Sequence, residues 1–168
     1  MGKLISRRAV LWGGVLTGAT LAAGRLVWLS APTLGMRVLS SREVDVVEAL
    51  ARVLFPPGQF SVAGGDGGTA PMVDVLLADY FPTRAVVGFR YLLKAVELGT
   101  VMSRGVSFSH LSSDEAAEVI DMWTKPQPVA RRLASDGFKA MLGMAFFRRP
   151  EVLADIGWRL DCMGEVSG

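Results

Sequence analysis

Proline-containing breaks divide most of this chain into segments of helical length. The breaks fall at residues 56–57, 82, 126–128 and 150, and proline interrupts a helix because it lacks the backbone N–H and clashes with the preceding turn. Between the breaks, apolar residues recur every three or four positions, which is typical of helices with one buried face. No stretch shows sustained alternation of polar and apolar residues. The pattern predicts an all-α fold, a compact bundle of about five to six helices.

Local signals indicate where these helices begin. Ser40 and Glu43, like Ser112 and Glu115, stand three residues apart in the capping-box arrangement, which satisfies free amides at a helix start. Pro71 suits a first helical turn. We therefore expect helices over residues 40–54, 71–81, 84–102, 112–124, 129–147 and 150–156. The second of these is expected to bury Val73, Leu76, Leu77 and Tyr80 and to expose Asp74 and Asp79.

The first 31 residues differ in composition from the rest of the chain. Basic residues precede an apolar run, and no acidic residue occurs before Glu43. A basic start followed by an apolar run is typical of an export signal or a membrane anchor. Ser6, Arg7 and Arg8, followed by one residue and two apolar ones, resemble a twin-arginine signal. That pathway carries proteins that have already folded in the cytoplasm, so the pattern predicts a periplasmic location or one on the outer face of the cytoplasmic membrane.

Two alternatives stay open for this N-terminal segment. Arg25 interrupts the apolar run, whereas a spanning helix needs about 20 apolar residues, and this favours a cleaved signal over a retained anchor. Residues 22–23 and 30–31 only approximate a cleavage site. We predict a twin-arginine signal or anchor over residues 1–31, a linker over 32–39 and one helical domain over 40–168.

The totals exclude several classes of function. The basic excess of the whole chain belongs to the N-terminal segment, and the remainder is slightly acidic, so we expect no binding to nucleic acid. The single cysteine, Cys162, excludes an intrachain disulfide and a cysteine metal cluster. We therefore expect no metal and no cofactor in this chain.

Two further features are weak candidates for chemistry. His110 is the only histidine, but a general base also needs a substrate or nucleophile and usually an orienting carboxylate, for which Asp114 is near in sequence. The glycine-rich residues 64–69 lack the preceding strand and the following lysine of a phosphate loop, which favours a flexible surface loop. Asp66 alone supplies too few oxygens for calcium.

The order of the segments resembles a known family. The similarity lies in residues 39–43, 55–58 and 73–76, and it continues through residues 108–112, 123, 131–133, 150–152 and 157–158. In this order they resemble the gluconate 2-dehydrogenase subunit 3 family. This chain differs in its long glycine-rich loop and in the Phe-Pro-Pro of residues 55–57, where Ile-Pro is more usual.

The resemblance implies a small non-catalytic subunit. In that family it accompanies a large flavoprotein dehydrogenase of the glucose-methanol-choline type, which binds FAD, and often a multihaem cytochrome c subunit. The small subunit supplies the export signal, and only Arg7 and Arg8 receive a role by this comparison. The expected function is therefore to bind, assemble and co-export a partner sugar or alcohol dehydrogenase through the twin-arginine translocase.

Two other functions stay open at this stage. One is a membrane-anchored helical scaffold without a flavoprotein, and the other is an independent periplasmic enzyme that uses Asp74 or Asp79 beside Tyr80. The end of the helix expected over residues 129–147 is apolar nearly all round, which predicts burial against another surface. Aromatic residues and methionine are enriched at interfaces, although any one such residue is more often found in the core. On this basis the predicted partner-facing residues are Met72, Tyr80, Phe108, Trp123, Phe146, Phe147 and Trp158.

Overall fold

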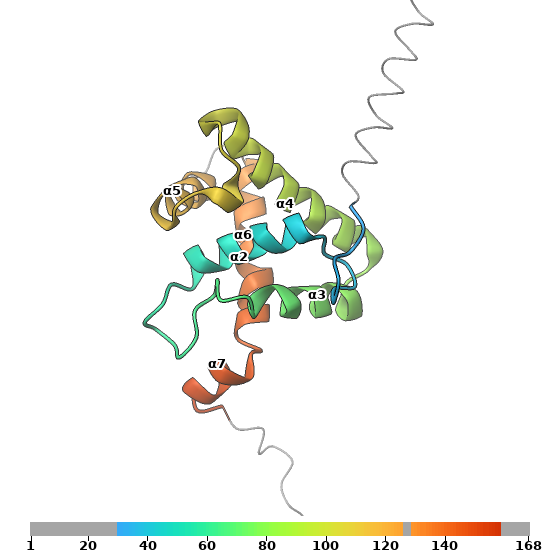
Figure 1. Cartoon of the computed structure of the whole chain (residues 1–168), viewed down its shortest axis with the longest axis vertical. Coiled ribbons are helices and arrows are strands. Elements are labelled where there is room, and N and C mark those ends of the chain that lie inside the picture. Colours follow the sequence, from blue (N-terminus) through green and yellow to red (C-terminus); the bar gives the residue numbers. More distant parts are fainter. Residues whose placement is uncertain (1–29, 126–128, 159–168) are drawn as a thin grey trace, which may run out of the picture. The chain divides into compact units, whose positions relative to one another are not determined.

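Helices make up all the regular secondary structure in the described part of the chain. The computed structural model describes residues 30–125 and 129–158, and the folded unit begins at Pro32. Within these residues there is no strand, so the predicted all-α bundle is confirmed (Figure 1). The elements are α2 (Ser41–Leu54), α3 (Thr69–Tyr80), α4 (Thr83–Arg104), the short 3-10 helix η1 (Phe108–His110), α5 (Ser113–Thr124), α6 (Val129–Phe146) and α7 (Pro150–Asp155).

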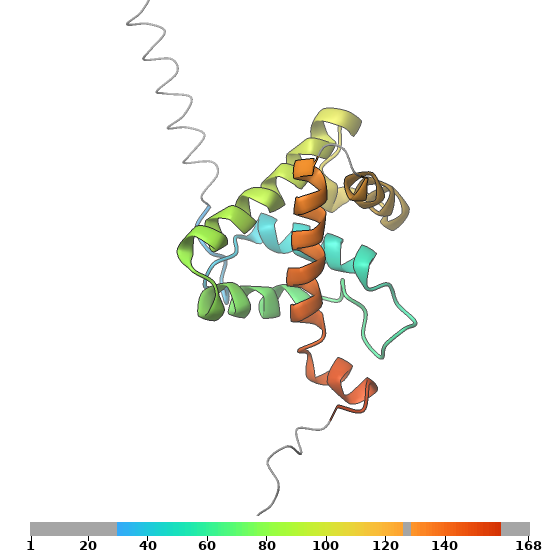
Figure 2. The same cartoon turned by 180° about the vertical axis from the view of Figure 1, so that it is seen from behind.

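Helix α2 is the central element of the bundle. It contacts α3, α4, α5, α6 and η1. Figure 1 shows α2 crossing in front of α6, and Figure 2, from behind, shows α6 in front with one side facing away from the bundle. Val46, Val47 and Leu50 of α2 are buried in the core. Helix α2 is therefore the element on which most of the other described helices pack.

The two predicted capping boxes are confirmed, whereas α3, expected from residue 71, begins at Thr69. At α2 the Glu43 carboxylate accepts hydrogen bonds from the backbone N–H and the hydroxyl of Ser40, each at 2.8 Å. At α5 the Ser112 N–H donates to Glu115 at 3.0 Å, and the Glu115 N–H donates back to the Ser112 hydroxyl at 3.4 Å. These bonds use amides that a helix start leaves without partners.

Aromatic side chains connect the helices at two places in the core. Phe138 of α6 packs edge-to-face on Phe89 of α4, with ring centres 6.0 Å apart, and lies 6.3 Å from Trp123 of α5. At the other end of α6, Phe146 stacks on Phe55 after α2, with ring centres 4.2 Å apart. The second contact joins the end of α6 to the end of α2.

A buried ion pair, which the sequence did not reveal, joins α2 to α4. The Glu43 carboxylate lies 2.9 Å from Arg90 Nε and 3.6 Å from Lys94 Nζ. Burial by itself raises the pKa of Glu43, but the hydrogen bonds from Arg90 and Ser40 outweigh it and hold the pKa below its usual value. The capping residue of α2 therefore also positions α4.

Two expectations about α3 are wrong. Asp74 is buried rather than exposed, and Tyr80 is 63% exposed rather than buried. The reason is that the Asp74 carboxylate accepts backbone N–H groups from three successive residues, Arg37 at 2.7 Å, Val38 at 2.9 Å and Leu39 at 2.8 Å. A buried carboxylate is tolerated when hydrogen bonds compensate its lost hydration.

The same bonds change the interpretation of residues 32–39. These residues were expected to form a linker, but Leu39 is fully buried. The Thr33 N–H also donates to the Leu39 carbonyl at 2.9 Å, which closes the segment into a loop. The segment that follows the predicted signal is therefore fixed to α3 and belongs to the folded unit.

Candidate functional site

The residues predicted to direct export lie outside the described part of the chain. This applies to Ser6, Arg7 and Arg8, and also to Cys162. The twin-arginine signal thus stays a prediction from sequence. The described residues instead show which surfaces the folded unit offers to a partner.

The predicted partner-facing residues fall into three groups. Phe108 and Phe146 have no exposed surface and belong to the core, so their assignment to an interface is corrected. Met72 and Trp123 are partly buried and pack against the core. Tyr80, Phe147 and Trp158 are exposed, and of these Tyr80 and Phe147 lie at or near the end of α6. Aromatic character alone could not separate these groups.

Helix α6 exposes an apolar side that these predictions missed in part. Val129, Leu133, Ala140, Met144 and Phe147 are all exposed. At 100° per residue they fall within an arc of about 60°, on the side opposite the buried core residues. We call these five residues the α6 outer face. Leu133, although on the same helix as the core residues Phe138 and Leu142, is 65% exposed.

Positive charge borders the α6 outer face. Helical spacing places Arg132 and Lys139 along one edge and Arg148 along the other, and all three are exposed. Arg148 also lies over the Tyr80 ring, 5.1 Å from its centre, which brings an exposed aromatic side chain beside the face. Asp136 is the only acidic residue of α6, and it lies 4.0 Å from Arg132. The border is therefore basic overall.

A glycine in the last turn of this helix has no close contact that requires it among the described residues. A Cβ added at Gly143 would meet no atom within 4 Å. Glycine inside a helix is less stable than alanine by about 0.5–1 kcal/mol, because its unfolded backbone has more freedom. This cost at Gly143 is therefore not offset by close packing within the described part of the chain.

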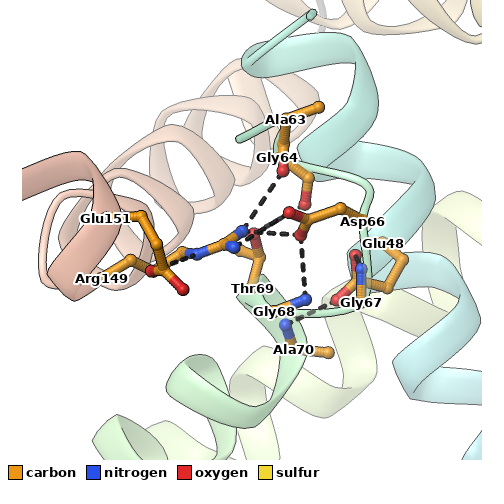
Figure 3. A network of polar contacts seen from close by, with 10 residues as sticks. All are labelled: Glu48, Ala63, Gly64, Asp66, Gly67, Gly68, Thr69, Ala70, Arg149 and Glu151. Atoms are coloured by element: carbon orange, nitrogen blue, oxygen red, sulfur yellow. Dashed lines mark hydrogen bonds and ion pairs between the residues drawn. The ribbon is translucent and has the colours of Figure 1, made fainter. Parts of the chain in front are cut away.

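A second candidate is the polar network around Arg149, shown in Figure 3. The buried Arg149 guanidinium donates to both Asp66 oxygens, at 2.6 and 2.9 Å, and to the Ala63 carbonyl at 3.2 Å. The hydrogen bond from Arg149 is the main cause that lowers the pKa of Asp66. Asp66 is therefore committed to Arg149, a pairing that sequence alone did not suggest.

Glu48 completes the network at the start of α3. Its carboxylate accepts the N–H of Ala70 at 2.7 Å and that of Gly67 at 3.1 Å (Figure 3). A carboxylate is favourable there because the first amides of a helix lack partners within the helix. Burial raises the pKa of Glu48, and the two N–H groups oppose that effect. The position that an external anion would take at this helix start is filled by Glu48.

The glycine-rich loop packs closely on α2. Gly64 is buried, its N–H donates to the Phe55 carbonyl at 2.9 Å, and a Cβ there would overlap the Ala51 carbonyl. The Thr69 hydroxyl donates to the Gly64 carbonyl at 2.6 Å. Gly64 therefore lies too close to α2 for a larger residue, whereas Gly67 in the same stretch is exposed and has open space around its absent Cβ.

His110 does not show the arrangement of a general base. Its Nδ1 lies 2.8 Å from the Ser107 hydroxyl and 3.2 Å from that of Ser109. Glu97, the carboxylate beside this turn, accepts the N–H and hydroxyl of Ser109 rather than contacting the ring. The Glu97 carboxylate is therefore engaged by Ser109, and no contact joins Asp114, the carboxylate considered from the sequence, to the ring among the described residues.

The carboxylates considered for an independent enzyme also have structural partners. Asp74 accepts the backbone N–H groups of residues 37–39. Asp79 pairs with Arg37 at 2.6 Å on the surface.

Over residues 30–125 and 129–158, no cluster of three or more histidine, cysteine or acidic residues could hold a metal ion. The helices in these same ranges include none with the length and apolarity to cross a membrane.

Comparison of the chain with protein-family models, with curated proteins and with solved structures gives no match. The function is therefore inferred from the residues and geometry of this chain, and the class of its partner from the resemblance in the order of its segments.

Proposed function

We propose that this chain is the small non-catalytic subunit of a dehydrogenase complex. It binds a FAD-dependent sugar or alcohol dehydrogenase and carries it through the twin-arginine translocase to the periplasm or the outer face of the membrane. The observation that carries the proposal is the sequence Ser6-Arg7-Arg8 before an apolar run, on a chain whose folded unit is a small helical bundle. A signal for folded export is most useful on such a chain if it serves a larger, cofactor-containing partner.

The geometry supports this role through the surface of the bundle. The α6 outer face exposes apolar residues near both ends of the helix, and a large exposed apolar surface often marks an interaction site. The bundle folds around α2 with residues 32–39 already fixed to α3. In this proposal the partner binds the folded bundle in the cytoplasm, takes up FAD there, and crosses the membrane without a signal of its own. A cytochrome c subunit, where present, joins the same complex.

The experiment changes the signal and follows the partner. The double variant Arg7→Lys, Arg8→Lys is expressed in the native cell, and dehydrogenase activity is measured in cytoplasmic and periplasmic fractions. We expect the flavoprotein to fold and to stay in the cytoplasm. The partner is identified beforehand by purification of the tagged chain, flavin absorbance and peptide mass spectrometry.

A matched control is the double variant Arg42→Lys, Arg84→Lys, which makes the same changes at two exposed arginines of α2 and α4 and should leave export unchanged. Normal export of the flavoprotein in the signal variant would refute the proposal. N-terminal sequencing of the exported chain then distinguishes a cleaved signal from a retained anchor.

A further inference from the structure

The α6 outer face is an apolar surface with a basic border, and the most exposed of its large side chains is Leu133. We infer that the partner subunit covers this face, and that it presents there an apolar strip with acidic residues at its edges. The inference rests on the proposed function for the identity of the partner. It adds the site on this chain and the chemistry of the surface that fits it.

The apolar character of the face is the first argument. A helix at the surface of a bundle normally carries polar residues on its outward side. Helix α6 instead has core residues such as Phe138 and Leu142 on one side and the α6 outer face on the other. Phe147 lies between the core side and the outer face. It is partly exposed, and its ring centre lies 5.6 Å from that of the buried Phe146. A helix that is apolar on both sides is suited to pack between its own bundle and a second protein.

Charge is the second argument, and it indicates which charges the partner surface carries. Arg132 and Lys139 border one edge and Arg148 the other, against the single acidic residue Asp136. Charges around an interface are usually complementary, so acidic groups on the partner fit this border. Asp136 lies beside the apolar residues with its side chain 59% exposed. That carboxylate would be repelled by an anionic lipid surface but can pair with Arg132 at the border of a protein interface.

Gly143 supplies the third argument. It lies beside Ala140 and Met144 on the outward side of α6, and open space surrounds the position of its absent Cβ. A missing side chain allows another backbone to come closer to the helix than alanine would. The partner is therefore expected to approach the α6 backbone most closely at Gly143.

The first test locates the contact directly. The photo-reactive residue p-benzoyl-phenylalanine is placed at Leu133 of the full chain in the native cell, and at the exposed Ala117 of α5 as a control. After irradiation, mass spectrometry identifies the cross-linked peptide. We expect an adduct at Leu133 with a peptide of the flavoprotein that contains apolar residues next to Asp or Glu, and none at Ala117.

Other results of this test overturn the inference. They are a cross-link to a second copy of this chain, an adduct with lipid alone, no adduct at Leu133, or a flavoprotein adduct only at Ala117. If the flavoprotein co-purifies with the chain but reacts only at Ala117, the proposed function stands and the site is wrong. If no flavoprotein co-purifies at all, the proposed function itself fails.

The second test separates binding from stability. Gly143→Ala is compared with Gly88→Ala, a helical glycine of α4 whose added Cβ would also meet nothing within 4 Å. Both changes should raise the thermal midpoint of the chain, because alanine favours the helix. Only Gly143→Ala should weaken retention of the flavoprotein, by about tenfold, because overpacking a close contact is destabilising. If the two variants retained the flavoprotein equally well, the inferred close approach of the partner to Gly143 would be overturned.

The third test examines the charge of the border. Lys139→Glu should weaken the complex with the flavoprotein, and the effect should shrink at high salt because solvent ions screen exposed charges. Arg42→Glu makes the same reversal of charge on the exposed side of α2 and should leave the affinity of the complex unchanged. Equal weakening by both variants, or stronger binding with Lys139→Glu, would overturn the acidic character assigned to the partner.

Discussion

Replacement of Arg149 by methionine should lower the free energy of unfolding by about 2–3 kcal/mol. The guanidinium side chain is only 7% exposed and makes two charge-assisted hydrogen bonds to Asp66. Removing one member of a buried ion pair usually costs about 3–5 kcal/mol, because the other charge stays buried without a partner. The Asp66 side chain is 33% exposed, so water can partly rehydrate it, and the expected cost is correspondingly smaller.

The assay is equilibrium unfolding of the purified chain, followed by far-ultraviolet circular dichroism in urea and on heating. Arg148→Met is the matched control, because Arg148 is exposed and its contact with the Tyr80 ring is worth about 0.5–1 kcal/mol. The double variant Asp66→Asn, Arg149→Met tests the pairing itself. Its loss should be smaller than the sum of the two single losses, because both changes remove the same interaction.

The pH dependence gives an independent check. The hydrogen bond from Arg149 holds the pKa of Asp66 below the ordinary value of 3.8, which this group has in the unfolded chain. Stability from a lowered carboxylate pKa is fully present above the unfolded value and is lost as the pH falls through the folded value. The difference between wild type and Arg149→Met should therefore narrow below pH 3.8. Equal stability of Arg149→Met and Arg148→Met at neutral pH would refute this reasoning.

Two further changes test how the loops are fixed to the helices. Asp74→Asn should cost about 2–3 kcal/mol in urea unfolding, because the amide replaces one acceptor oxygen with a donor facing the N–H groups of residues 37–39. Asp79→Asn, at an exposed ion pair, should cost about 0–1 kcal/mol, and equal losses would contradict the role of Asp74. Gly64→Ala should lower stability by about 1–3 kcal/mol, since the new Cβ would overlap the Ala51 carbonyl. An unchanged thermal midpoint for Gly64→Ala would show that the loop does not pack on α2 in this way.

Local chemistry explains why the helices could be predicted from the sequence. The capping pairs at Ser40 and Ser112 and the break at residues 56–57 act within a few residues, so their effect does not depend on the rest of the fold. Helix α2 was expected over 40–54 and spans Ser41–Leu54, and α6 was expected over 129–147 and spans Val129–Phe146. The 3-10 helix η1 was missed, because a single turn leaves no periodic pattern to detect.

Which side of a helix is buried was harder to predict, because it depends on what packs there. Tyr80 was placed inside and Asp74 outside from their spacing, whereas the chain before α2 returns to cover Asp74. Phe108 was considered for an interface, but η1 packs on α2 and α4 and buries it completely. Periodicity locates a stripe of residues, but it does not say which neighbour will cover that stripe.

The sequence by itself determined the helices and their capped starts, because these depend on residues close together in the chain, and it carries the twin-arginine-like pattern on which the export prediction rests. Only the tertiary structure decided the pairing of Arg149 with Asp66, which are 83 residues apart, and the close packing of Gly64 on α2. It also decided that α6 buries one apolar side and exposes the other. The physical reason is that burial and long-range pairing depend on how the helices pack together, which no local pattern in the chain encodes.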